Sequence, residues 1–391
     1  MGVNKLAWAL VLAGLGGCGG KDPLADLPPG CKAMLPTCLG VQKICAAGPV
    51  CQACPDGQYA TATGVCSPIG TAMTHDFAEF TTQSGQEILS LCQSWTIGNA
   101  EELWINAVEL TQNEASHHSN WLFVPDDKYP GPDGVWPCSD RNYDELSAAI
   151  FGGVLYAQST QATHEVQKFP NHAAVRIPPY SRIISDVHLL NATPNAVTGH
   201  AQLSIYPLPL SDVKVKLTPL HVGFRKLDIP PLSSSRSQAS CEVASQFETQ
   251  LSHPFDAKLY YILPHYHALG RRFTVSHMGG KHAGEIIFDA VGASGEARGR
   301  GYDPPIDLTG DDGISFACEF DNQTADPVHW GFGNQEMCEL LGFAESPLAW
   351  ESQVSMVAPD TTATGAMPVS TGECTTLAFG YDFNKPGGPP P

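Results

Sequence analysis

The sequence is poor in basic residues, with 21 Lys and Arg against 40 Asp and Glu in 391 residues and a formal net charge of −19. Nucleic acids and anionic lipid head groups recruit basic patches, so this balance argues against both as partners. A negative chain is compatible with cationic substrates and with metal ions, but the charge selects neither. The sequence also lacks any apolar run long enough to cross a bilayer, which takes about 20 residues.

Helical periodicity is absent from nearly the whole chain, and no repeat of fixed period is present. Gly (38) and Pro (32) are abundant and separate many short apolar runs, such as 103–108 and 182–187. This pattern predicts an all-β protein rich in turns, with one short helix at 143–150. Apolar residues make up 42% of the chain and charged residues 16%, which is a globular composition.

The first 18 residues resemble a bacterial lipoprotein signal. Lys5 supplies positive charge, residues 6–15 form a short apolar core, and Leu15-Gly16-Gly17-Cys18 is similar to the lipobox, whose cysteine becomes the lipidated first residue. The alternative is an ordinary cleaved signal peptide in which Cys18 is incidental. We therefore expect an exported protein of the bacterial envelope. It would be anchored to the outer membrane or cell surface through lipid on Cys18, with no other membrane contact.

Cysteines are numerous: removing Cys18 from the 13 leaves 12, an even number that predicts disulfides in an oxidising compartment. Half of them lie in one short segment, at Cys31, Cys38, Cys45, Cys51, Cys54 and Cys66. That segment has few large apolar residues, so three bridges would have to replace a core. The Cys51-x-x-Cys54 spacing also permits a zinc or redox site.

Composition divides the chain into six expected parts. These are a lipoprotein signal peptide at 1–18, a tether at 19–30, a Cys-rich disulfide module at 31–70, an N-terminal β domain at 71–230, a C-terminal β domain at 231–382 and a disordered tail at 383–391. The boundary between the β domains is placed at the Pro- and Ser-rich stretch 230–237.

Two histidines follow the apolar run 259–262. Alternate residues of a strand share a face, so His265 and His267 can point their imidazoles at one metal ion. Pro264 cannot donate to a β-ladder, which places this strand end at an edge or a bulge. The alternative is a pair of strand histidines that face water.

Three further segments carry possible ligands. His117 and His118 are adjacent, so both can bind one ion only at a bulge or a strand end; otherwise one is buried and one exposed. His188 ends an apolar strand and by itself suits a satisfied core histidine. Met337, beside Cys338, by itself suits core filler.

Taken together, the order His-His, Val-His, His-x-His and Glu-Met-Cys resembles the copper type II, ascorbate-dependent monooxygenases, the family of the peptidylglycine α-hydroxylating and dopamine β-hydroxylating enzymes. The resemblance covers roughly residues 75–380 and implies two jelly-roll-type β-sandwich domains after the small Cys-rich module. It implies two copper ions that face each other across a solvent-filled cleft. One ion would be held by His117, His118 and His188, and the other, catalytic ion by His265, His267 and Met337.

The ligand types agree with this implied chemistry. Three imidazoles suit a copper ion that cycles between Cu(I) and Cu(II), and a soft thioether favours Cu(I). The family uses O2, with ascorbate or another one-electron reductant, to hydroxylate a C–H bond. Within this frame a Cys318–Cys338 bridge would fix the loop that presents Met337. Cys92 with Cys138 and Cys241 with Cys374 are the other pairs expected.

The sequence departs from the family around the substrate. Leu263 stands two residues before the His-x-His, where peptide-amidating members place an arginine that grips a carboxylate. Glu339-Leu340-Leu341 replaces their Asn and Tyr beyond the methionine. The implied substrate is a different small molecule or peptide, neutral or cationic, near Leu263 and Glu339. Arg271 and Arg272 are expected at a solvated strand end.

Two other functions remain open on the sequence. One is a non-catalytic exported copper-binding protein that keeps the ligands for metal handling. The other is a surface scaffold or adhesion protein with a relic copper site, which the Cys-rich module would suit.

Overall fold

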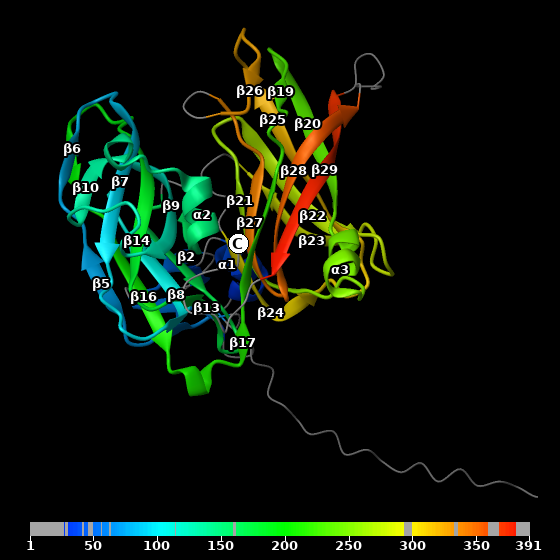
Figure 1. Cartoon of the computed structure of the whole chain (residues 1–391). Coiled ribbons are helices and arrows are strands. Elements are labelled where there is room, and N and C mark those ends of the chain that lie inside the picture. The colour runs from blue at the N-terminus through cyan, green and yellow to red at the C-terminus, as the bar shows by residue number, and fades with distance from the viewer. Residues whose placement is uncertain are drawn as a thin grey trace, which may run out of the picture.

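The computed structural model describes residues 27, 30–40, 43–45, 50–55, 57–61, 64–113, 115–158, 162–292, 299–331, 335–358 and 367–380. Over these ranges the chain is mostly β: a small disulfide-bonded module is followed by two β blocks of jelly-roll type, as the sequence predicts (Figure 1). The predicted signal peptide with Cys18 and the tail at 383–391 lie outside the described residues.

The Cys-rich module consists of one helix and four short strands. They are α1 (Cys31–Gly40), β1 (Lys43–Cys45), β2 (Cys51–Ala53), β3 (Gln58–Ala60) and β4 (Cys66–Pro68). Its bridges are Cys31–Cys45, Cys38–Cys51 and Cys54–Cys66. Cys51 and Cys54 therefore belong to different disulfides, and the zinc or redox alternative for this pair is wrong. Buried cysteines form much of the small apolar core of the module. A core of this size cannot stabilise the module alone, so the disulfides must contribute.

The first β block has two sheets that enclose an apolar core. Its strands are β5 (Met73–Asp76), β6 (Phe80–Thr82), β7 (Glu87–Thr96), β8 (Leu103–Thr111), β9 (Ser116–Pro125), β10 (Gly134–Pro137), β11 (Gly153–Gln158), β12 (His164–Lys168), β13 (Ala173–Ile177), β14 (Ser181–Leu190), β15 (Val197–Gly199), β16 (Gln202–Leu208) and β17 (Val215–Lys216). One of these sheets has the order β10-β7-β14-β9-β11 and the other β17-β13-β8-β16-β5, with β12 also on β8, while β6 and β15 form a separate two-stranded sheet.

The short helix expected at 143–150 is α2 (Glu145–Phe151), whose N-cap Asp144 accepts a hydrogen bond from the Ser147 amide. It packs against β9 of the five-stranded sheet.

The second block is built on one ten-stranded sheet. Its elements are β18 (Thr218–Gly223), β19 (Asp228–Ile229), β20 (Ser233–Glu242), α3 (Ala244–Leu251), β21 (Lys258–His265), β22 (Gly270–Met278), β23 (Ile286–Val291), β24 (Arg300–Asp307), β25 (Gly313–Asn322), β26 (Val328–His329), β27 (Glu339–Glu345), β28 (Leu348–Ala358) and β29 (Val369–Gly380). The order is β23-β22-β25-β20-β29-β28-β18-β27-β21-β24. Phe288 of β23 and Tyr302 of β24 share one core cluster although their strands lie at opposite ends, so the sheet curls around that core.

The predicted domain boundary at residue 230 is wrong. β17 still pairs with β13 of the first block, whereas β18 pairs with β27 and β28 of the second, so the chain changes block between Lys216 and Thr218. The Pro- and Ser-rich stretch has turn-like composition, but its serines begin β20. Ser235 and Ser237 are buried there, on one face of the strand. The alternation of buried and exposed side chains here is that of a strand, although the composition alone predicts a turn.

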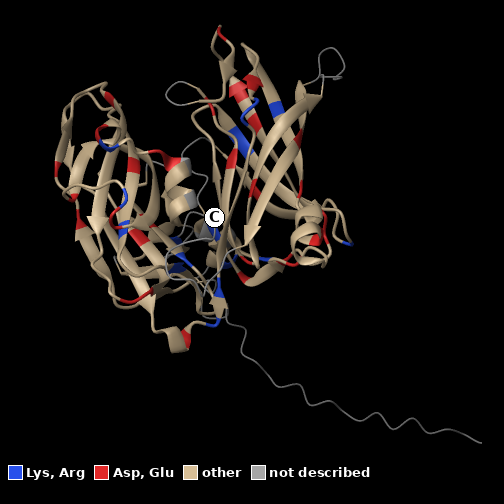
Figure 2. Ribbon diagram, in the orientation of Figure 1, with Lys and Arg blue, Asp and Glu red and all other residues tan. Residues whose placement is uncertain are grey.

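The two blocks carry the three remaining bridges, and they are the expected pairs: Cys92–Cys138, Cys241–Cys374 and Cys318–Cys338. Six disulfides indicate an exported protein in an oxidising compartment. No helix among the described residues has the length and apolar character to cross a membrane. Acidic side chains are spread over both blocks, in keeping with the net charge (Figure 2).

An aromatic contact joins the blocks. Tyr261 and Phe343 of the second block belong to the core cluster of the first. The ring of Phe169, from the first block, lies 5.1 Å from that of Phe343 and 6.0 Å from that of Tyr261. Each edge-to-face pair contributes about 0.5–1.5 kcal/mol beyond the area it buries. This contact holds β21 against the first block.

Candidate metal centre

The first histidine set lies where β9 and β14 pair irregularly. His188 is opposite His118, but Leu189 is opposite Ser116, so β9 has one extra residue, His117, at this point. A β-bulge of this kind breaks the alternation of faces. It allows the adjacent pair to reach one place, as the sequence analysis required for a shared ion.

Within this set the ring nitrogens face one another. His188 Nδ1 lies 2.8 Å from His118 Nε2 and 3.1 Å from His117 Nδ1. His188 Nε2 contacts Glu87 Oε1 at 2.8 Å. A carboxylate on the far nitrogen fixes the tautomer, so that Nε2–H donates and the Nδ1 lone pair points to the other two rings. Glu87 comes from β7, 101 residues before His188, and no sequence motif marked it.

The second set lies at the end of β21. The ladder between β21 and β24 ends at Ile262, before Pro264 and His265, as expected from a proline that cannot donate to a ladder. His265 is opposite Glu339 of β27 on the other side. His267 lies just beyond the strand, and its Nδ1 donates to the Gln335 carbonyl at 2.8 Å. Its Nε2 is buried with no hydrogen-bond partner among the described residues.

A buried carboxylate, Glu336, holds the loop that carries His267. Its two oxygens accept hydrogen bonds from the backbone amides of His267 (2.8 Å) and Leu269 (2.7 Å). Burial raises the pKa of Glu336 to about 7, against the effect of these amides. The clamp links the His-x-His segment to the residue before Met337. In the sequence, this clamp was indicated only by the glutamate of the Glu-Met-Cys motif.

The structure brings the two sets together. The ring centroids of His118 and His265 are 5.1 Å apart, and those of His118 and His267 are 5.6 Å apart. Two groups of three possible ligand atoms result: His117, His118 and His188, and His118, His265 and His267. The expected solvent-filled cleft between the sets is therefore wrong for this structure, in which His118 belongs to both groups and is only 8% exposed.

Four imidazoles of the cluster have lowered pKa values. Burial lowers the pKa of His117 to about 4 and those of His118 and His265 well below the ordinary value, with repulsion from neighbouring histidines adding to it. Burial also lowers the pKa of His267. Neutral rings keep a lone pair for a metal ion, so the cluster suits a metal better than it suits protons.

Met337 lies beside the second set. It is 7% exposed, follows Glu336 directly and precedes Cys338, which is bridged to β25. The expected bridge thus fixes the backbone next to the methionine.

The two residues expected to contact the substrate are both buried. Leu263 is 2% exposed and belongs to the apolar contact between the blocks, so its side chain is not open to a substrate in this structure. Glu339 is buried, accepts a hydrogen bond from Trp330 Nε1 at 2.6 Å and lies 3.0 Å from His221 Nε2. Its carboxylate therefore interacts with other side chains of the protein. Arg271 and Arg272 begin β22 as expected, and Arg272 pairs with Asp289 at 2.8 Å.

A charged network missed by the sequence analysis surrounds Glu339. His221 lies between Glu339 and Glu351, whose Oε2 contacts His221 Nδ1 at 2.7 Å. Burial disfavours the imidazolium, but Glu351 and Glu339 outweigh it and raise the pKa of His221 to about 10. A Cβ at Gly223 would clash with the carboxylate of Glu339 and the amide of Gln353 in their present positions, so the glycine leaves room for both side chains.

The donor set fits copper. It offers buried neutral imidazoles, an unpartnered Nε2 on His267, partners that orient His188 and His267, and a thioether in the adjoining loop. Imidazole also suits zinc, iron and nickel, whereas a thioether favours Cu(I).

No family model matches the sequence, and no curated protein matches it. Similar solved structures include the cowpea mosaic virus top component, a naturally occurring empty particle (10% identity, 69% of this chain and 89% of that chain, TM-score 0.30). Others are the PBSX exported protein XepA (10%, 78% and 97%, TM-score 0.19) and PBCV-1 VP54 fitted into a reconstruction of the virophage Sputnik (7%, 71% and 94%, TM-score 0.23). These TM-scores are below 0.5, so the similarities carry no argument about function.

Proposed function

We propose that this protein is a two-copper monooxygenase that uses O2 and a reductant such as ascorbate to hydroxylate a C–H bond of a small molecule or peptide. One observation carries the proposal: histidines from three separate segments, which resemble the ligand motifs of one copper family in order, converge in one buried cluster. Copper bound there would supply one-electron redox and O2 chemistry.

The protein's own residues have distinct roles in this proposal. His117, His118 and His188 would hold one ion, and His265, His267 and Met337 the other. Glu87 and the Gln335 carbonyl orient His188 and His267, and Glu336 fixes the loop that carries His267. Because the cluster is buried, the contact between the blocks has to open for a substrate to reach it.

Oxygen consumption tests the proposal. Copper-loaded protein should consume O2 when ascorbate is added, and zinc-loaded protein should not. His267→Ala should abolish the uptake, whereas the matched change His282→Ala, at an exposed histidine outside both ligand groups, should leave it intact. Copper-loaded wild type without ascorbate-driven uptake would rule out the enzyme.

A non-catalytic copper-binding function is the second candidate, and His118 favours it. Since His118 belongs to both ligand groups, one ion bound by histidines of both blocks would saturate the cluster. This candidate predicts tight copper binding without O2 uptake. For either function we propose attachment to the envelope through lipid on Cys18, which the intact mass of the mature protein checks.

A further inference from the structure

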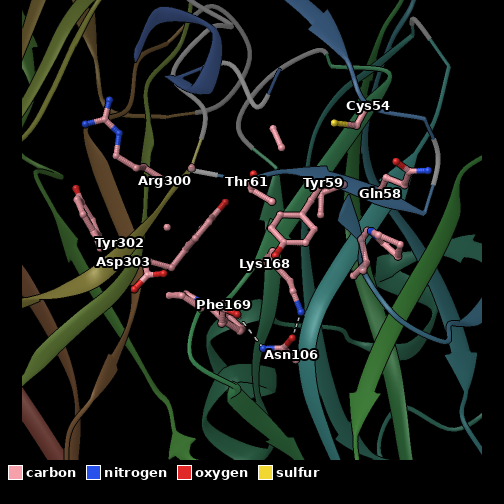
Figure 3. Close-up of a pocket in the computed structure, with 18 of the residues that line it drawn as sticks. Cys54, Gln58, Tyr59, Thr61, Asn106, Lys168, Phe169, Arg300, Tyr302 and Asp303 are labelled. Atoms are coloured by element: carbon pink, nitrogen blue, oxygen red, sulfur yellow. Dashed lines mark hydrogen bonds between the residues drawn. The ribbon is translucent and has the colours of Figure 1, made fainter. Parts of the chain in front are cut away.

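A large cavity lies between the Cys-rich module and both β blocks. Its volume is about 1050 Å³, at the upper end of the range for ligand sites. Tyr59 of the module, Lys168 of the first block and Tyr302 of the second are among the residues that line it (Figure 3). The function proposed above does not use this cavity.

Lys168 is the central feature of the cavity. Its Nζ donates to Asn106 Oδ1, and Asn106 Nδ2 donates to the carbonyls of Phe169 (2.9 Å) and Ala173 (2.6 Å), which fixes the amide (Figure 3). Within the described part of the chain no carboxylate forms an ion pair with Lys168. Burial lowers the pKa of Lys168 to about 8, and no other cause contributes. The cation thus has a neutral partner only, and an anion would supply the missing countercharge.

The rest of the cavity wall is also more basic than the protein as a whole. Arg300 lines the cavity from the second block, with its guanidinium over the Phe288 ring, and Lys43 lines it from the module. Asp303 is the one carboxylate among the described lining residues, and it accepts a hydrogen bond from Asn171 Nδ2 at 3.4 Å. This excess of cations contrasts with a net charge of −19.

The Cys-rich module forms the roof of the cavity and is tied to the block below it. The Gly57 amide donates to Glu109 Oε1 at 2.9 Å, and the same oxygen contacts His164 Nε2 at 2.7 Å. Tyr59 follows two residues after Gly57 and presents its ring to the cavity (Figure 3). The module therefore supplies a flat aromatic surface above the lysine.

We propose that this cavity binds a small organic anion with a planar body, held by charge at Lys168 and by the tyrosine rings. Tyr261 lines the cavity, and His265 lies four residues further along β21, about 13 Å away at the rise of a strand. The ligand is thus separate from the histidine cluster. Two kinds of anion share this chemistry: an enediol reductant such as ascorbate, and a redox-inert carboxylate. The proposal does not depend on copper.

Calorimetric titration of metal-free protein with intact disulfides tests the inference. Benzoate should bind at least about tenfold more tightly than its neutral analogue benzamide, since a charge-assisted hydrogen bond is lost. Lys168→Gln should weaken benzoate binding by about tenfold or more, Lys168→Arg should largely preserve it, and the exposed control Lys281→Gln should not change it. Thermal melting of each variant checks folding.

Ascorbate, titrated without oxygen, separates the two kinds of anion. Competition between ascorbate and benzoate assigns the site to a reductant, whereas binding of benzoate alone assigns it to a redox-inert carboxylate. Equal affinity for benzoate and benzamide, no effect of Lys168→Gln in folded protein, or no binding of either anion would overturn the inference. Because copper is absent, these results are independent of the monooxygenase proposal.

Discussion

His118 and His265 come from different β blocks, yet their rings lie 5.1 Å apart. His118 is paired with His188 across two strands of the first block, and His265 is at the end of β21 in the second. Metal binding and the packing of the two blocks against each other therefore depend on the same contact. A ligand change at His118 should therefore affect both histidine sets, whereas a change at His117 should affect one.

The copper count follows from this difference. Dialysed, copper-loaded protein should contain close to two copper ions per chain, and His117→Ala close to one. His118→Ala should bind less copper than His117→Ala, because His118 serves both groups. His200→Ala, at an exposed histidine, is the control. Elemental analysis measures the ratio, and a wild-type value near one that His117→Ala leaves unchanged would remove the first-block site.

Met337→Leu tests the soft ligand. The change nearly conserves volume, so the free energy of unfolding should fall by less than about 1.5 kcal/mol. If the thioether binds copper, Cu(I) affinity and ascorbate-driven O2 uptake should fall sharply, while the three-histidine set still loads. Met337→His should retain metal but lose turnover. Met73→Leu is the control, and unchanged Cu(I) binding in Met337→Leu would show that Met337 is core filler.

Glu336→Gln tests the loop clamp. The glutamine amide has one acceptor oxygen, so one of the two backbone amides held by Glu336 loses its partner, at a cost of about 1–3 kcal/mol. Urea denaturation should show this loss, and copper titration should show weaker binding at the second set only. The exposed Glu345→Gln should change neither quantity. A clamp variant with wild-type stability would mean that the loop is held by other contacts.

The pKa of His221 predicts a pH dependence of stability. It is raised from 6.5 to about 10 in the folded protein, so folding takes up a proton between these values. The stabilisation is complete below about 6.5 and is lost as the pH rises through about 10.

His221→Gln should therefore flatten the fall in unfolding free energy over this range. It should also cost about 1–3 kcal/mol at neutral pH, between the values for exposed and fully buried pairs, because Glu339 and Glu351 lose their cation. Urea denaturation at several pH values checks both effects, with His200→Gln as control. An unchanged slope would show that the imidazolium is not stabilised.

The leucine at position 263 allows a prediction about which peptides are not hydroxylated. Without an arginine at this position, peptides that end in glycine should not be hydroxylated, as product mass spectrometry would show. Leu263→Arg should not create that activity, because the side chain is buried in the contact between the blocks. It should instead destabilise the protein by about 3 kcal/mol or more, while the exposed Leu377→Arg should be nearly neutral. Efficient turnover of such a peptide would contradict the assignment of Leu263.

The fold class and the candidate ligands could be predicted from the amino-acid sequence. Short alternating apolar runs predict strands with one buried face, and an even set of cysteines in a chain whose first 18 residues resemble an export signal predicts disulfides. His117 with His118, and His265 with His267, were recognisable because strand geometry restricts where adjacent and alternate side chains point. The bulge at His117 was needed for the first pair to act together, and the structure contains it.

The contacts that these residues make depend on the tertiary structure. Sequence spacing does not report the contact between two blocks, so the approach of His118 to His265, the burial of Leu263 and the enclosure of Glu339 by His221 and Trp330 were not predicted. The predicted boundary between the blocks was wrong for the same reason. β18 belongs to the ten-stranded sheet because β27 and β28 pair with it. Strand pairing and burial depend on partners distant in the chain, whereas the sequence pattern records only which face of each strand is apolar.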